Sequence, residues 1–264
     1  MIPLTLAHEV VGQGPPVVLI HAFPLSREMW RAQWNALQRR IRVIAPDLPG
    51  FGQSLQQAKP SIPQMAREIA GLLDQLKVRE PVVICGLSMG GYVTFEFLRQ
   101  FPQRVRALGL FSTRAVADTP EGREGRLKAA QKIRSEGLEA FSRTILPKLV
   151  GKTTLESRPA VVQEITRMIL ANQPEGVADA LLAMADRQDS TELLASISCP
   201  TLVVAGEEDS FIPASDAQAM ASRIPGTQLQ VIHQAGHLVN LEQPVAFQAI
   251  LSGWLEISLK EVSP

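Results

Sequence analysis

The sequence reads Gly86-Leu87-Ser88-Met89-Gly90-Gly91 directly after the apolar run Val82–Cys85 and directly before a helical pattern. A serine therefore stands at a tight turn from a strand into a helix. Such a turn forces the serine backbone into a strained conformation, and glycine two positions to either side lets neighbouring backbone pass closely. The pattern predicts Ser88 as a nucleophile above the carboxyl end of a sheet. The alternative is a glycine-rich turn with an incidental serine.

Short apolar runs on both sides of this turn predict buried strands. Most are rich in Val, Ile and Leu and lack alternation, which is typical of a parallel sheet covered on both faces. Helical patterns lie between them, and two of these begin with proline, which suits a first helical turn. We therefore expect an α/β fold with a mostly parallel central sheet flanked by helices. The expected strands are Val17–His21, Ile41–Pro46, Val82–Cys85, Val105–Phe111, Thr201–Ala205 and Leu229–His233, and the expected helices are Pro63–Leu76, Gly90–Phe101, Pro213–Ile224 and Pro244–Ile257.

One interval, Ala115–Gln188, breaks the alternation of strand and helix. It contains no convincing strand, and its roughly 70 residues far exceed the dozen or so that a crossover connection needs. We interpret it as a helical insertion between two strands; a set of ordinary crossover helices is the alternative. Helical periodicity is present at Leu127–Ile133, Leu138–Leu146, Pro159–Leu170 and Val177–Met184. The predicted core domain is then 1–114 with 189–264, and the insertion is 115–188.

Composition narrows the class of protein. Lys plus Arg number 26 and Asp plus Glu number 26, so the zero formal charge indicates no attraction to nucleic acid or to an anionic membrane. Cys85 and Cys199 lie beside apolar runs and are expected to be buried free thiols. No run reaches the roughly 20 apolar residues of a membrane span. Met1–Val11 has no signal-peptide pattern, so we expect a cytoplasmic protein. These patterns do not encode an oligomeric state.

A serine hydroxyl needs a base, and His237 is the candidate. It follows Gly236 in the turn after a predicted strand, at the edge of the sheet where ligands bind. Asp209 follows the strand Thr201–Ala205 and is the candidate acid that accepts the imidazole N–H. Glu207 and Glu208 are rivals by chemistry alone, and a solvated acidic loop is the alternative for all three. The order Ser88, Asp209, His237 is that of the triad in strand–turn–helix hydrolases.

The loop His21-Ala22-Phe23-Pro24 follows the first buried strand. An oxyanion hole needs two backbone N–H groups aimed at one point. Met89, the residue after the nucleophile, and Phe23 are the candidates for these two donors. We expect His21 to hold the loop by side-chain hydrogen bonds rather than to transfer protons.

Taken together, these pieces and Asp47-Leu48-Pro49-Gly50-Phe51-Gly52-Gln53-Ser54 resemble the α/β-hydrolase superfamily over nearly the whole chain. The sequence is most similar to small bacterial carboxylesterases, enol-lactonases and cofactor-free haloperoxidase-type perhydrolases. The resemblance implies that the insertion is a helical cap that follows the sixth strand and covers the site. It also implies a serine rather than an aspartate nucleophile. The acidic and histidine residues outside Ser88, Asp209 and His237 show no metal-ligand spacing, so no metal or organic cofactor is expected.

One position departs from the family pattern, because Ala22 replaces the usual glycine before the oxyanion residue. Alanine is compatible with the loop if its φ is below zero. The cap, Phe23, Met89, Leu25 and Trp30 are expected to wall the pocket, although Trp30 is equally compatible with a packed core. Arg114 follows the strand Val105–Phe111 and is a candidate to hold a substrate carboxylate. The alternative is an ion pair with Asp118 or Glu121.

Three functions follow from these residues. The first is a carboxylesterase-like hydrolase that cleaves esters of small molecules through an acyl-enzyme. The second is hydrolysis of a lactone, as by a 3-oxoadipate enol-lactonase, or of a carbon–carbon bond. The third is a small-molecule receptor or signalling protein that keeps the fold and triad but turns over slowly, since a fold does not fix a function.

Overall fold

The computed structural model describes residues 6–55 and 59–260. Its centre is a sheet of seven described strands in the order β1-β3-β2-β4-β5-β6-β7. Only β1 runs antiparallel to its neighbour β3, and every other pair is parallel. The strands are β1 (His8–Val11), β2 (Pro16–Ile20), β3 (Arg42–Pro46), β4 (Val82–Leu87), β5 (Val105–Phe111), β6 (Thr201–Gly206) and β7 (Gln228–Ile232). The expected mostly parallel sheet is confirmed.

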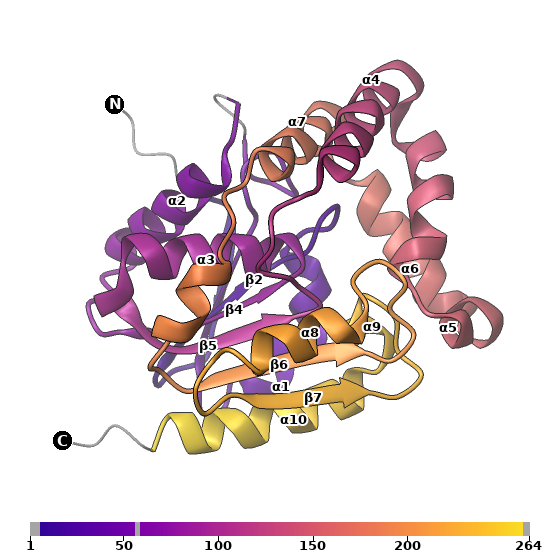
Figure 1. Cartoon of the computed structure of the whole chain (residues 1–264). Helices are drawn as coiled ribbons and strands as arrows, with labels where there is room; N and C mark the ends of the chain where they lie inside the picture. The colour runs from indigo at the N-terminus through magenta and orange to yellow at the C-terminus, as the bar shows by residue number, and fades with distance from the viewer. Residues whose placement is uncertain (1–5, 56–58, 261–264) are drawn as a thin grey trace.

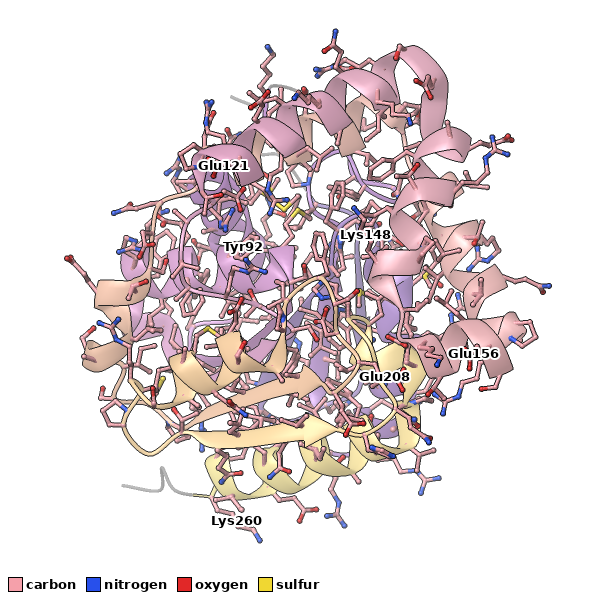
Figure 2. The ribbon with its side chains drawn as sticks, turned by 45° about the vertical axis from the view of Figure 1, so that its right-hand side comes forward. Tyr92, Glu121, Lys148, Glu156, Glu208 and Lys260 are labelled. Carbon is pink, nitrogen blue, oxygen red and sulfur yellow. The ribbon has the colours of Figure 1, made fainter. Side chains whose placement is uncertain are left out.

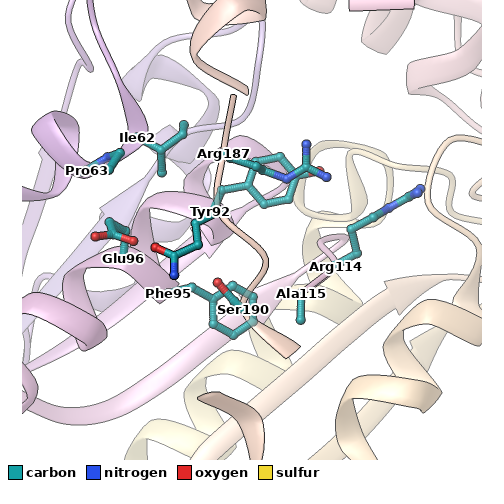
Figure 3. Close-up of a pocket in the computed structure, with 10 residues that line it drawn as sticks. Ile62, Pro63, Tyr92, Phe95, Glu96, Arg114, Ala115, Arg187 and Ser190 are labelled. Carbon is teal, nitrogen blue, oxygen red and sulfur yellow. The ribbon is translucent and has the colours of Figure 1, made fainter. Parts of the chain in front are cut away.

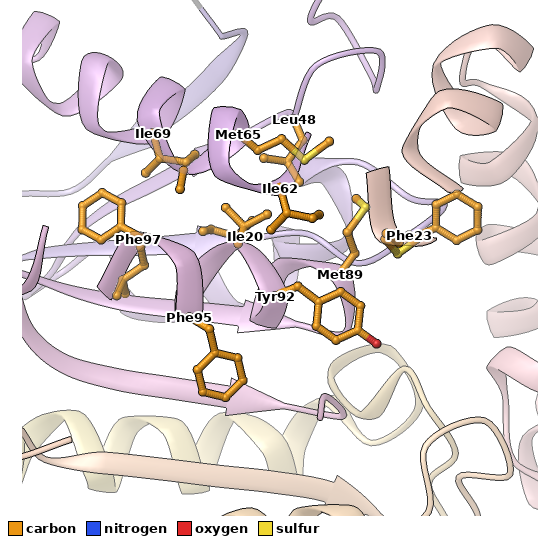
Figure 4. Packing of buried hydrophobic residues seen from close by; sticks show 14 of the residues in the cluster. Ile20, Phe23, Leu48, Ile62, Met65, Ile69, Met89, Tyr92, Phe95 and Phe97 are labelled. Atoms are coloured by element: carbon orange, nitrogen blue, oxygen red, sulfur yellow. The ribbon is translucent and has the colours of Figure 1, made fainter. Parts of the chain in front are cut away.

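Helices cover both faces of the sheet (Figure 1). Along β2, Val18 and Ile20 pack into one apolar cluster, while Val17 and Leu19 pack into the other. Successive side chains of a strand point to opposite faces, so an unbroken apolar run supplies both cores. Figure 4 shows the first cluster, where Ile20 meets helices α2 and α3. The flanking helices are η1 (Arg27–Trp30), α1 (Arg31–Leu37), α2 (Ile62–Gln75), α3 (Met89–Gln100), η2 (Pro102–Arg104), η3 (Thr191–Ser196), α8 (Ala214–Ala221), α9 (Val239–Glu242) and α10 (Pro244–Ser258).

All six expected strands are present, with ends that shift by two residues at most. The four expected core helices are also present. The sequence analysis missed α1 and α9, which are too short to show a clear apolar periodicity. The two thiols differ: Cys85 is fully buried, and burial raises its pKa, whereas Cys199 is only half-buried, so the expectation of burial is wrong for Cys199.

The interval between β5 and β6 is helical and projects from one end of the sheet (Figure 1). It contains α4 (Pro120–Leu149), α5 (Lys152–Ser157), α6 (Pro159–Leu170) and α7 (Pro174–Ala185). Within α4, Gly137 has φ 78° and ψ 178°, so two helical parts meet there, as the two separate sequence patterns predicted. The interval follows the fifth described strand in chain order, whereas the family resemblance implied the sixth.

A buried ionic cluster lies where this helical segment joins the core. Asp118 hydrogen-bonds Arg126, and its other oxygen lies 2.7 Å from the guanidinium of Arg187. Arg187 in turn lies 4.2 Å from the ring centroid of Tyr92 on α3. Burial alone raises the pKa of Asp118, but the hydrogen bonds and charges of Arg126 and Arg187 outweigh it and leave the pKa lowered. The carboxylate of Asp118 is therefore paired with two guanidinium groups at the base of the helical segment.

We predict that Asp118→Asn lowers the free energy of unfolding by about 2 kcal/mol at neutral pH, because two cations lose their carboxylate. The lowered pKa makes this contribution complete above the ordinary carboxyl pKa of about 4 and lost as the pH falls through the folded-state value. Urea unfolding at pH 7 and near pH 3 measures the difference. Asp186→Asn, which removes an exposed partner of Arg123, is the control. An equal loss in both variants would contradict the prediction.

Candidate active site

Ser88 lies between β4 and α3 with φ 55° and ψ −113°, a conformation that non-glycine residues rarely adopt. The turn is held on both sides of the serine. Ser88 N donates to Phe111 O at 2.9 Å, and Thr113 Oγ1 donates to Ser88 O at 2.9 Å. The neighbouring strand β5 and the residues after it therefore stabilise the strained backbone.

The flanking glycines are sterically required. A Cβ on Gly86 would collide with the carbonyl oxygen of Gly90, and a Cβ on Gly90 would collide with that of Ile20 at the end of β2. A Cβ on Gly91 would collide with the Thr113 side chain. The turn is thus packed against its own backbone and against two neighbouring strand ends, as the glycine spacing predicted.

His237 and Asp209 form a buried pair. His237 Nδ1 lies 2.8 Å from Asp209 Oδ2, and both side chains are fully excluded from solvent. Asp209 Oδ1 accepts the backbone N–H groups of Phe211 at 2.9 Å and of Ile212 at 2.8 Å. A carboxylate in this position accepts a hydrogen bond from Nδ1–H of the imidazole, which leaves Nε2 as the basic nitrogen.

His237 Nε2 is buried and has no hydrogen-bond partner within the described part of the chain. A buried polar atom without a partner is costly, and such atoms are concentrated where a ligand or a reacting group completes the bond. The ring of Phe211 packs edge-on against the imidazole with centroids 5.1 Å apart. The imidazole is therefore fixed on one side by Asp209 and Phe211 and chemically available on the other.

The two rival acids have other partners. Glu207 lies 2.5 Å from the ring of His233, and both side chains are exposed. Glu208 accepts from Thr153 N at 2.8 Å and from Thr153 Oγ1 at 2.5 Å, and Figure 2 shows it beside α5. Of the three acids, only Asp209 is hydrogen-bonded to His237.

The His21 side chain holds the loop after β2 through hydrogen bonds, as expected. Its Nδ1 lies 3.0 Å from Ala22 O, and its Nε2 accepts Leu48 N at 2.9 Å. Complete burial lowers the pKa of His21, so the imidazole is neutral and holds two loops together. Ala22 is absent from the described non-glycine residues with positive φ, so alanine is compatible with the loop. Phe23 stands in this loop, and Met89 opens α3, where the first N–H groups lack intrahelical acceptors.

A cavity of about 400 Å³ lies between the core and the helical segment. Phe23 from the loop after β2 and Phe211 from the loop after β6 bring it next to the residues described above. Tyr92 and Lys148 face it from α3 and from α4 (Figure 2). The full lining is Phe23, Tyr92, Arg114, Asp118, Gly122, Gly125, Arg126, Ala129, Phe141, Ile145, Lys148, Leu181, Phe211 and Ile212. A crevice behind Tyr92, between Arg187 and Glu96, has only about 10 Å³, the space of one water (Figure 3).

Three expected pocket residues do not line this cavity. Leu25 and Trp30 are fully buried in the second core cluster, and Met89 is fully buried in the first. Trp30 packs against Phe111 and Phe247, with ring centroids 6.3 and 6.0 Å away. Phe23 packs in the first apolar cluster, whereas the apolar side chains that follow it pack in the second, on the opposite face of the sheet. The alternative of a packed core tryptophan is the one observed.

Arg114 does line the cavity, but its partner differs from both acids suggested by the sequence. Its Nε lies 3.2 Å from Asp216 on α8, and one of its terminal nitrogens donates to Phe211 O at 2.9 Å. The sequence analysis missed Tyr92, Phe211 and Lys148. Tyr92 lies one helical turn after Ser88, and Phe211 two residues after Asp209, so for these two residues proximity to the candidate catalytic residues was the available signal.

In the part of the chain that the structure describes, no group of three or more His, Cys, Asp or Glu side chains is arranged to hold a metal ion. None of the described helices is both long and apolar enough to cross a bilayer.

Comparison with known proteins fits this geometry. A family described as alpha/beta hydrolase fold matches residues 15–244. The chain belongs to this family. A solved structure of a thermophilic esterase from Thermogutta terrifontis, with malate bound, is 44% identical, with a TM-score of 0.93 over 96% of this chain and 93% of that one.

Lactonases are also among the relatives. The enol-lactonase from Burkholderia xenovorans LB400 is 27% identical, with a TM-score of 0.87 over 95% of this chain and 96% of that one. A 3-oxoadipate enol-lactonase of Acinetobacter baylyi is 28% identical over 92% of this chain and 90% of its own length. Relatives with esterase and with lactonase names therefore each match at least 92% of the chain.

We predict that Asp209→Asn abolishes the low-field proton resonance of His237 Nδ1–H, since an amide N–H₂ there faces the imidazole and favours the other tautomer. Proton NMR of the folded variant measures this without a substrate. Glu207→Gln, a neutralised neighbour that pairs with His233, should keep the resonance. If the resonance persisted in Asp209→Asn, the 2.8 Å contact between His237 Nδ1 and Asp209 Oδ2 would not be what fixes the tautomer.

Proposed function

We propose that this protein is a serine hydrolase that cleaves carboxylic esters of small molecules through an acyl-enzyme on Ser88. The observation that carries the proposal is the buried His237–Asp209 pair with a free Nε2, on the same sheet edge as the strained Ser88. The loops after β4, β6 and β7 bring the three residues to that edge, where ligands bind in open α/β sheets. Relatives named as esterases and enol-lactonases support an ester-cleaving hydrolase.

In this mechanism Ser88 Oγ attacks the ester carbonyl while His237 Nε2 takes its proton. The carbonyl π electrons move to oxygen, and the backbone N–H groups of Phe23 and Met89 stabilise the oxyanion. His237 then gives the proton to the leaving alkoxide, and the acyl group stays on Ser88. Water attacks the acyl-enzyme with His237 again as base, which releases the acid and restores the serine. Asp209 remains ionised and stabilises the imidazolium.

We assign residues 1–114 and 189–264 to the hydrolase core and 115–188 to a helical cap over the substrate. The support is the cavity itself, since its lining comes from both parts. We also propose a cytoplasmic location, because the two cysteines are free thiols, which suits a reducing compartment.

The electrostatics of the cavity favour a substrate with a free carboxylate, in an ester or a lactone. Arg114, Arg126 and Lys148 line the cavity together with one acid, Asp118. Arg114 is paired with Asp216 and Arg126 with Asp118, but Lys148 has no ion-pair partner in the described chain. Lys148 therefore offers positive charge to an anionic group in the cavity.

We predict that short-chain p-nitrophenyl esters are hydrolysed and that Ser88→Ala lowers the rate by about 10⁴-fold or more. Ser222→Ala, a change of an exposed serine on the end of α8, is the matched control. The dependence of the rate on acyl-chain length then reports the size of the cavity. A wild type no faster than Ser88→Ala would refute the general esterase and would favour a narrow lactonase or the receptor function.

We predict that the p-nitrophenyl monoester of glutaric acid is a better substrate than the uncharged valerate ester of the same length. Lys148→Gln should lower kcat/KM for the anionic ester about fivefold, the worth of one partly exposed charge pair, and leave the neutral ester unchanged. Lys132→Gln, on α4 beside Glu136, is the control. Equal losses for both esters would exclude a carboxylate site at Lys148.

A further inference from the structure

The turn between α4 and α5, residues 149–153, contacts both loops that carry the candidate acid and base. Leu149 O lies 3.3 Å from the N–H of Leu238, the residue after His237. Thr153 gives two hydrogen bonds to Glu208, the residue before Asp209. The helical cap is thus joined directly to the neighbours of His237 and Asp209 and not only to the rim of the cavity.

Glu242 hydrogen-bonds both the turn at residues 149–153 and the His237 loop. It ends α9, the short helix that follows His237, and it is only 2% exposed. Its Oε2 accepts Gly151 N at 2.7 Å, and its Oε1 accepts Leu238 N at 3.1 Å. Burial raises the pKa of this carboxyl, and backbone N–H donors act against that rise. One side chain therefore bridges the cap turn and the backbone of the His237 loop.

The contact leaves no room for either partner to move alone. A Cβ on Gly236, the residue before His237, would collide with Gly151 N. A Cβ on Gly151 would collide with the Glu208 carboxylate and lie 2.9 Å from Gly236 N. The backbones of Gly151 and Gly236 are in direct contact with no side chain between them. A shift of the turn at residues 149–153 therefore displaces the His237 loop.

We propose that Glu242 is a positioning residue, which locks residues 149–153 of the cap against the His237 loop and so sets the imidazole for proton transfer with Ser88. The proposal rests on the proposed hydrolase function. Glu242 does not touch the reacting atoms and acts through Leu238 and Gly151. The cap then has a second task besides enclosing substrate, because its junction with α5 holds the base in place.

Glu242→Gln tests this with almost no change of volume. A glutamine offers one acceptor oxygen and an N–H₂ group, so either Leu238 N–H or Gly151 N–H faces a donor. We expect kcat to fall about tenfold, the effect of one lost hydrogen bond on a catalytic loop, with KM within about twofold. We also expect the low-field His237 Nδ1–H resonance to shift or broaden. Glu256→Gln, an exposed glutamate of α10, should change none of these.

Thr153→Val provides a second variant that does not disturb a buried carboxylate. It removes the side-chain hydrogen bond to Glu208, and we expect a smaller fall in kcat of about threefold, again with KM retained. If Glu242→Gln does not fold, Thr153→Val decides the proposal by the same two readouts. An unchanged kcat and an unchanged resonance would overturn it, even if the melting temperature falls, because stability alone would then be affected.

The two proposals fail in different ways. A wild type without ester hydrolysis, equal to Ser88→Ala, refutes the proposed function. The His237 resonance needs no substrate, so it still reports whether Glu242 sets the imidazole. A normal wild-type rate with an unaffected Glu242→Gln refutes the positioning role alone.

Discussion

The backbone of Ser88 is the constraint on which the site depends. A serine at φ 55° is unfavourable by itself and persists only when its surroundings determine it. Here β5 supplies the carbonyl of Phe111, Thr113 supplies a hydroxyl, and Gly86 and Gly90 remove the side chains that would block the turn. The parallel sheet thus stabilises the strained turn at Ser88, and the helix α3 begins directly after that turn.

Asp209, His21 and Glu242 are buried side chains near this turn whose polar atoms have hydrogen-bond partners, in contrast to His237. Asp209 accepts three N–H groups, His21 serves two loops, and Glu242 accepts two backbone N–H groups. Such full satisfaction is expected of polar groups removed from water. Nε2 of His237 stands out against it as a buried nitrogen without a partner in the described chain. The hydrogen bonds around the His237–Asp209 pair occupy Nδ1 of His237 and both carboxylate oxygens of Asp209. In the described chain they leave Nε2 of His237 available for acid–base chemistry.

The helical segment is more than an appendage to the sheet. It is attached at its base by Arg187, which lies over the ring of Tyr92 on α3, and at its far turn by Asn172, which hydrogen-bonds Pro24 O and Gly52 N at 2.8 Å each. At the α4–α5 turn it is attached by the hydrogen bond from Gly151 N to Glu242. These attachments reach the loop of Phe23 and the loop of His237. A segment inserted in sequence between β5 and β6 thereby contacts loops from both ends of the chain.

The sequence by itself determined the features that rest on short-range sterics and periodicity. The glycine spacing around Ser88 permits one kind of turn, and continuous apolar runs between helical patterns specify a covered parallel sheet; both could be read locally. Only the tertiary structure decided which of three adjacent acids meets His237, because that depends on how the loops after β6 and β7 approach each other. It also placed Leu25 and Trp30 in the core and Tyr92, Phe211 and Lys148 at the cavity. Those assignments depend on which face of the sheet a loop turns toward and on where the cap docks, and both are set by packing between residues far apart in the chain.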